Sequence, residues 1–93
     1  MAASGFSRAK ASIESKSFSD EQLTVFKQII SNNCVSVSQV VGFMNLFTYE
    51  EEKVTVAKLA YPKTVDKGNY YQVNDALTYS DSIEALNGFI EKQ

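Results

Sequence analysis

Apolar residues recur every three or four positions through most of this chain, which is the spacing of helices with one buried face. Residues 20–32 place their large apolar side chains on one face and their polar side chains on the opposite one. The same spacing returns over residues 36–47, 48–61 and 78–90. Valines at the start of the second segment favour a strand by propensity alone, but the capping box at its start and the helical spacing of its apolar residues outweigh this preference. We therefore predict an all-α fold, a compact small domain with four main short helices.

The starts of these helices can be located from their capping residues. Ser19 and Ser36 each follow an apolar residue and precede a glutamine by three positions, which is the pattern of a capping box. The other two helices follow threonines with an acidic residue three positions on, Thr48 and Thr78. Because these four caps are unevenly spaced, we interpret the serine signature as two helix starts that frame one antiparallel helical hairpin, and not as an internal repeat.

Residues 63–77 are the least regular part of the chain. Turn-forming residues at 66–69 are followed by paired tyrosines and by further apolar residues that need burial. A structureless loop of this length is uncommon inside a small domain. The segment therefore predicts one short helix at about Tyr70–Ala76, in addition to the four main helices.

The first seventeen residues differ in composition from the rest. They are rich in Ser and Ala, and Phe6 and Ile13 are their only large apolar side chains after Met1. We predict that residues 1–17 form a flexible or weakly docked N-terminal tail, the docked form being a helix. Residues 18–93 are then expected to form a single helical domain.

The charge balance excludes some classes of partner. A net charge of −2 gives the chain no general attraction to nucleic acid or to an anionic membrane. No apolar run approaches the roughly 18 residues that span a membrane, or the roughly 7–15 residues of a signal peptide. We therefore expect no nucleic-acid partner and no membrane insertion, and a cytoplasmic location if the chain is complete.

Few side chains are suited to catalysis or metal binding. The absence of histidine removes the commonest general base and the commonest metal ligand. The only cysteine, Cys34, excludes an intrachain disulfide, and we expect it to be a small buried side chain in a turn. The carboxylates of residues 50–52 point about 100° apart on a helix and do not converge on one cation. We predict no catalytic residue, no metal and no cofactor.

Tyrosines are the remaining candidates for a recognition surface, because each ring gives a large contact area with a polar tip. The chain has five of them, Tyr49, Tyr61, Tyr70, Tyr71 and Tyr79. The alternative is structural: their rings cover the end of the 48–61 helix while their hydroxyls bond to backbone. Both roles can hold for different tyrosines. The candidate binding residues are those in and beside the irregular segment, Tyr61, Tyr70, Tyr71, Asn74 and Asp75.

Several blocks between Cys34 and Ile90 carry a family resemblance. They are Leu46–Glu50, Ala57–Pro62, Asp66–Tyr71 and Val73–Tyr79. In these blocks the chain resembles an uncharacterised helical family, catalogued as domain of unknown function 4476. The resemblance implies a small all-helical module that is often part of longer proteins, and it carries over no catalytic residues. Residues 1–17 lie outside it.

These observations favour a binding role over a catalytic one. We expect a non-catalytic module that binds a protein or a peptide, and we expect it to be monomeric. The alternative is a small-ligand-binding or enzymatic domain that uses Cys34 or a pocket under residues 63–77.

Overall fold

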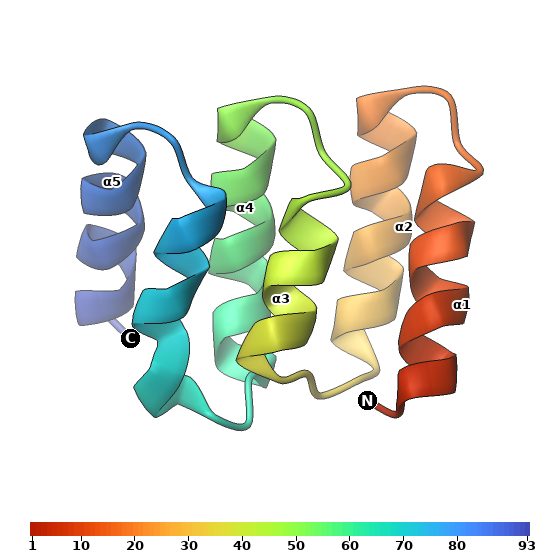
Figure 1. The fold of residues 1–93 in the computed structure, drawn as a ribbon, viewed down its shortest axis with the longest axis horizontal. Coiled ribbons are helices and arrows are strands. Elements are labelled where there is room, and N and C mark those ends of the chain that lie inside the picture. Colours follow the sequence, from red (N-terminus) through yellow and green to blue (C-terminus); the bar gives the residue numbers. More distant parts are fainter.

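Three helical hairpins lie side by side in the computed structural model, which describes residues 1–93 (Figure 1). The segments are α1 (Ala3–Glu14), α2 (Ser19–Ser31), α3 (Val37–Met44), α4 (Glu50–Ala60), α5 (Ser80–Glu91) and two 3₁₀ helices, η1 (Tyr61–Lys63) and η2 (Lys67–Ala76). The predicted all-α fold is confirmed. None of these helices has the length and apolar character that crossing a lipid bilayer requires.

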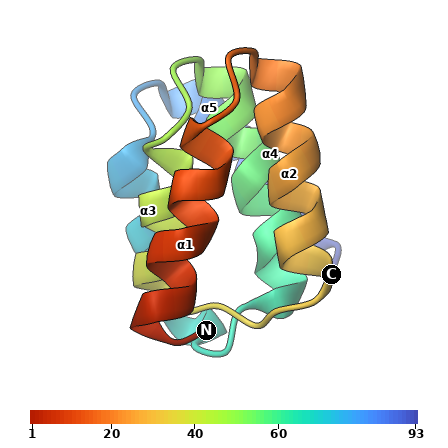
Figure 2. The ribbon, with the colours of Figure 1, turned by 90° about the vertical axis from the view of Figure 1, so that its right-hand side faces the viewer.

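The helices form two layers, which are seen edge-on in Figure 2. One layer holds α1, α3 and η2, and the other holds α2, α4 and α5. Within the second layer α4 contacts both α2 and α5, while in the first layer α3 contacts η2. Because each helix has one wide apolar face, stacking the two layers buries these faces together in one core.

The three hairpin turns repeat one short sequence pattern at one edge of the molecule. An aromatic residue directly precedes α2, α4 and α5, each time after a Ser or Thr and two residues before a carboxylate. These residues, Phe18, Tyr49 and Tyr79, are 31 and 30 residues apart. We did not predict this spacing, because the capping pattern links Ser19 with Ser36, and these two residues start helices from opposite edges of the molecule.

The pairing of the first predicted helices differs from expectation. We predicted that residues 20–32 and 36–47 form the hairpin, but α2 pairs with α1, and α3 pairs with α4. The contact between α2 and α3 is made by Phe26 and Phe43, whose ring centroids are 5.3 Å apart. The packing partner of α2 is therefore the N-terminal helix α1, and the sequence pattern alone did not predict this pairing.

The prediction that the packed domain starts at Phe18 is wrong. Of the two alternatives for residues 1–17 the helix is present, and it reaches the core: Ile13 is fully buried and Ala9 nearly so. The Met1 ammonium group donates a hydrogen bond to the Cys34 carbonyl oxygen over 2.7 Å. The small residues of α1 allow close packing, so few large apolar side chains suffice to dock it.

Only one of the four predicted caps forms. Ser36 and Gln39 make the full capping box at the start of α3, with hydrogen bonds of 3.3 and 3.1 Å. The starts of α2, α4 and α5 have no side-chain cap, because an aromatic residue occupies each N-cap position. Gln22, the expected partner of Ser19, donates instead to the Lys16 carbonyl oxygen.

At the opposite edge of the molecule, backbone hydrogen bonds join the connection before α3 to the end of η1 and the residues that follow it. Val35 donates to the Lys63 carbonyl oxygen and accepts from the Val65 N–H, both at 2.9 Å. The Asp66 carboxylate accepts a 2.8 Å hydrogen bond from the Val37 N–H at the start of α3. These contacts place η2, which contains the predicted short helix, directly against α3.

Gly42 allows α1 to approach α3. An added Cβ there would lie 2.5 Å from Cζ of Phe6, well inside contact distance. Phe6 in turn lies edge-on to Phe43, with ring centroids 5.0 Å apart. The docking of α1 therefore depends on the absent side chain at Gly42.

Ile13→Ala tests whether α1 belongs to the core. Because Ile13 is fully buried, we expect the free energy of unfolding to fall by about 2–5 kcal/mol. The control is Ser7→Ala on the exposed side of α1, which should change stability by less than about 0.5 kcal/mol. Urea denaturation measures both, and equal stabilities for the two variants would mean that α1 is a tail.

Gly42→Ala tests the close approach of α1. Alanine is favoured over glycine inside a helix by about 0.5–1 kcal/mol, so Gly88→Ala in α5, where a Cβ meets nothing within 4 Å, should gain that amount. Gly42→Ala should not gain it, because the new methyl group displaces Phe6. In a Phe6→Ala background the gain should return. An equal gain from both glycine substitutions in the otherwise unchanged chain would contradict the contact.

Candidate functional site

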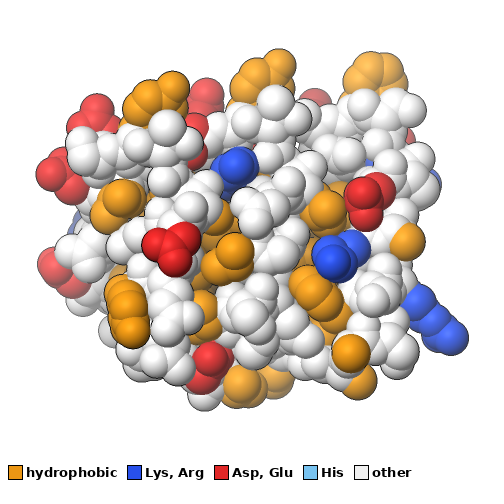
Figure 3. Space-filling view, viewed as in Figure 1, with side chains coloured by type: hydrophobic (Ala, Val, Ile, Leu, Met, Phe, Trp, Pro, Cys, Tyr) orange, Lys and Arg blue, Asp and Glu red, His pale blue; other side chains and the backbone are white.

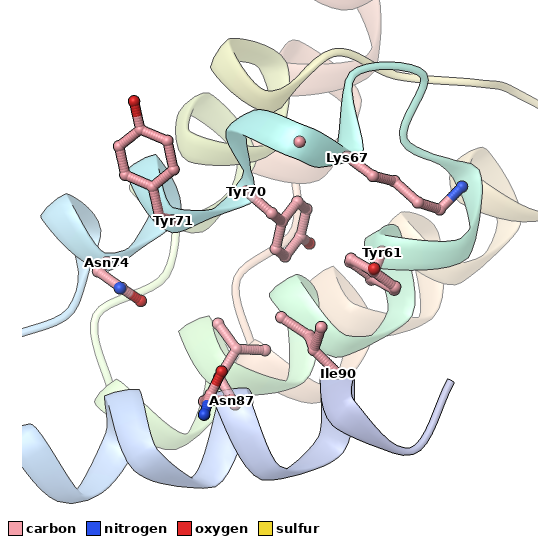
Figure 4. A pocket seen from close by; sticks show the side chains of 9 residues that line it. Tyr61, Lys67, Tyr70, Tyr71, Asn74, Asn87 and Ile90 are labelled. Atoms are coloured by element: carbon pink, nitrogen blue, oxygen red, sulfur yellow. The ribbon is translucent and has the colours of Figure 1, made fainter.

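A pocket opens between η2 and the second half of α5 (Figure 4). Its volume is about 250 Å³. The residues that line it come from η1, η2 and α5: Tyr61, Lys67, Gly68, Tyr70, Tyr71, Asn74, Leu86, Asn87 and Ile90. The pocket therefore exists only when η2 and α5 lie side by side as a hairpin, because these two helices supply its opposite walls.

Tyr70 forms the inner wall. Its side chain is buried, and its hydroxyl donates a hydrogen bond to the Ala57 carbonyl oxygen of α4. Its ring lies edge-on to Tyr61, with centroids 4.9 Å apart and planes at 82°. Burial raises the pKa of Tyr70 far above its usual value, and the hydroxyl stays protonated at any physiological pH. Tyr70 therefore has the structural role that we considered for the tyrosines, in which the hydroxyl bonds to backbone.

Lys67 places a positive charge at one side of the pocket. Its ammonium group lies 5.8 Å from the centre of the Tyr61 ring and donates a 3.1 Å hydrogen bond to the Thr64 carbonyl oxygen. A cation over an aromatic ring is attracted by the electrons of its face. These contacts orient both side chains at the pocket wall.

The mouth of the pocket is amphipathic. Tyr71 is 68% exposed and its hydroxyl points away from the cavity (Figure 4). Asn74 and Asn87 bring side-chain amides from η2 and α5 to opposite sides. Each amide group can both donate and accept hydrogen bonds, so the mouth can pair with a peptide backbone.

The floor comes from α5, which the sequence analysis did not select. Leu86 is fully buried and Ile90 is partly exposed one turn later. Their spacing of four residues puts both on the helix face toward η2. That spacing was visible in the sequence, but it is common to many helices and did not distinguish this one.

Four of the five candidate binding residues line the pocket, namely Tyr61, Tyr70, Tyr71 and Asn74. Asp75 does not, and its side chain is exposed. Gly68, Tyr71 and Asn74 are spaced three residues apart and therefore share one side of the 3₁₀ helix η2, whereas Asp75 is turned about 120° away from Asn74.

Cys34 is exposed, so our expectation of a buried side chain is wrong. It lies in the connection between α2 and α3, where its backbone, and not its sulfur, makes the contact with Met1. Its side chain lines none of the three cavities of the molecule. The structure contains no group of three or more side chains suited to holding a metal ion.

Comparison with known proteins finds one family. The model of the family described as "Domain of unknown function (DUF4476)" matches residues 1–90, including the segment that we had placed outside the resemblance. No curated protein and no solved structure matches the chain.

Tyr70→Phe tests the buried hydroxyl. Loss of the hydrogen bond to Ala57 should cost about 0.5–1.5 kcal/mol in the free energy of unfolding, whereas Tyr71→Phe at the exposed ring should cost less than about 0.5 kcal/mol.

The variants Tyr70→Phe and Tyr71→Phe also test a pH dependence of stability. The unfolded chain releases the Tyr70 proton near pH 10, while the folded chain keeps it at higher pH. The contribution of Tyr70 to the free energy of unfolding is therefore fully present below about pH 10, and it declines as the pH rises further. Urea unfolding between neutral pH and pH 11 should show a smaller decline in Tyr70→Phe than in Tyr71→Phe. Parallel declines would contradict a protonated, buried Tyr70.

Proposed function

We propose that this chain, which belongs to the DUF4476 family, is a non-catalytic protein-interaction module whose η2–α5 pocket takes one apolar side chain of a partner peptide. The observation that carries this proposal is the chemistry of the pocket: an aromatic wall, an aliphatic floor and two amides at the mouth. Recognition sites commonly combine an apolar anchor pocket with a few polar groups that hold the peptide backbone.

The size of the pocket supports a side chain over a whole small molecule. Its volume of about 250 Å³ lies below the roughly 300–1,000 Å³ of small-ligand sites. Tyr61 and Ile90 are partly exposed and border this space, so an inserted side chain would cover apolar surface on both. Covering that surface stabilises a complex roughly in proportion to its area.

The alternative is a ligand-binding or enzymatic domain. A reaction at Cys34 would need a binding pocket beside the thiol, and Cys34 lies outside all three cavities. This favours binding over thiol chemistry as the role of the domain.

Selection from a library of short random peptides tests the proposal. Peptides that bind the wild-type domain should share one apolar anchor residue. Asn87→Trp, a change at an exposed residue of the pocket mouth, should fill the entrance and weaken the selected peptides about tenfold or more, a loss equal to that of one well-buried anchor. Fluorescence anisotropy with labelled peptides measures the affinities.

The matched control is Glu84→Trp. This residue is also exposed on α5 but does not line the pocket, so the control should keep the affinity of the unchanged domain. Selected peptides that bind Asn87→Trp and Glu84→Trp equally well would rule out the pocket as the binding site.

A further inference from the structure

Three aromatic side chains stand exposed in a row at the edge where the hairpins turn. Phe18, Tyr49 and Tyr79 are 70%, 64% and 63% exposed. They directly precede α2, α4 and α5, which are neighbours in one layer (Figures 1 and 2). In the space-filling view, apolar side chains rise in three groups along this edge, with acidic side chains beside them (Figure 3). We call these three residues the aromatic edge.

The aromatic edge is locally unfavourable for folding. Each of its residues occupies an N-cap position with extended backbone and no side-chain hydrogen bond. Ser, Thr, Asp and Asn are preferred there because their oxygens accept hydrogen bonds from the first helical N–H groups. Departures from such local rules without a gain in packing are typical of functional surfaces.

The rings of the aromatic edge are free to bind. The aromatic pairs and cation–π contacts within the molecule involve other rings. Lys10, Lys58 and Lys67 cover Phe6, Phe89 and Tyr61 respectively. The faces of Phe18, Tyr49 and Tyr79 are therefore open to a cation from outside the chain.

Carboxylates surround the same rings. The first turn of α2 holds Asp20 and Glu21, that of α4 holds three consecutive glutamates, and that of α5 holds Asp81. No basic residue lies among the first three residues of these helices, and the nearest ones in sequence are Lys16 before α2 and Lys53 after the glutamates of α4. Negative charge at helix starts is favoured by the helix dipole, but together with three open rings it makes an edge that attracts a cationic partner and repels an anionic one.

A groove of about 460 Å³ between α4 and α5 opens at this edge. The carboxylates of Glu50, Glu51 and Asp81 line it together with Tyr79 and with Lys58, whose ammonium group lies 5.7 Å from the centre of the Phe89 ring. Val54 and Ala85 contribute apolar surface along which the aliphatic stem of an arginine or a lysine can lie.

Glu50 holds the two turns of this groove together. Its carboxylate accepts hydrogen bonds of 2.7 and 2.9 Å from the Thr78 and Tyr79 N–H groups. Desolvation raises the pKa of Glu50, but these hydrogen bonds outweigh it and the net shift is downward. Glu50 therefore remains an anion and ties the backbone of Thr78 and Tyr79 to the first turn of α4.

We propose that the aromatic edge binds an extended, arginine- or lysine-rich segment of a partner protein, with one cationic side chain in the α4–α5 groove. Neighbouring packed helices lie roughly 8–10 Å apart, and an extended chain advances about 3.3 Å per residue. Cationic residues at every third position therefore match successive rings of the edge. This surface is separate from the η2–α5 pocket, and the two proposals can fail independently.

The test uses a labelled flexible peptide with arginine at every third position among serines and glycines. Its counterpart has glutamine in place of every arginine. By fluorescence anisotropy the arginine peptide should bind the wild-type domain, and more weakly as salt is raised, while the glutamine peptide should not bind. Replacing each edge ring by serine should weaken binding about two- to fivefold, and the triple variant Phe18→Ser/Tyr49→Ser/Tyr79→Ser should lose about tenfold or more.

Folding and binding are separated by the choice of serine. Because serine is a preferred N-cap residue, the triple variant should unfold at the same or a higher urea concentration than the wild-type domain. Val65→Ser is the control for an exposed apolar side chain away from the edge and should bind normally. A triple variant that is folded and still binds the arginine peptide with unchanged affinity would overturn the proposal.

The role of charge is tested with two double variants that each remove two negative charges. Glu51→Gln/Asp81→Asn should weaken the arginine peptide, whereas Glu84→Gln/Glu91→Gln, which removes two exposed carboxylates outside the groove, should not. Equal effects of the two double variants would mean that the attraction to the peptide is non-specific, and this result would refute the site. Equal binding of the glutamine peptide would show that the edge does not require a cationic side chain, and self-association lost in the triple variant would identify a second copy of the chain. Either result rejects the cationic segment.

Discussion

Phe43 is the residue at which the first two hairpins meet, and the arrangement of the other helices follows from it. Its fully buried ring lies edge-on to Phe6 of α1 and close to Phe26 of α2, with centroids 5.0 and 5.3 Å away. Because protein interiors are close-packed, these three rings fix how near the hairpins come. Gly42, next to Phe43, leaves the space that Phe6 occupies. This contact makes the N-terminal segment part of the core.

The second and third hairpins are joined by carboxylates. Asp66 accepts a hydrogen bond from the first turn of α3 at one edge of the molecule, and Glu50 accepts two from the turn before α5 at the other. Backbone N–H groups at helix starts have no partner within their own helix, so these contacts satisfy them and fix the register of the third hairpin. The η2–α5 pocket and the groove between α4 and α5 both depend on that register.

Much of the helix content could be predicted from the sequence. The apolar spacing located α2 to α5 to within a few residues, and the turn chemistry around 66–69 indicated a short helix near Tyr70. Of the candidate binding residues, four line one pocket. Asp75 and the α5 residues of the floor could not be assigned, because which neighbours share a wall depends on how η2 packs against α5.

The class of fold, the approximate helices and the capping box at Ser36 follow from the amino-acid sequence, since these depend on interactions within a few residues. The tertiary structure alone decided that α1 is docked, that α2 pairs with it, and that Phe18, Tyr49 and Tyr79 form one edge. Contacts between distant segments leave no periodic pattern in the local sequence. An aromatic residue at an N-cap position can be recognised only once the start of the helix is known. The 31- and 30-residue spacing of those rings gains its meaning from the stacking of hairpins, which burial of the shared core enforces.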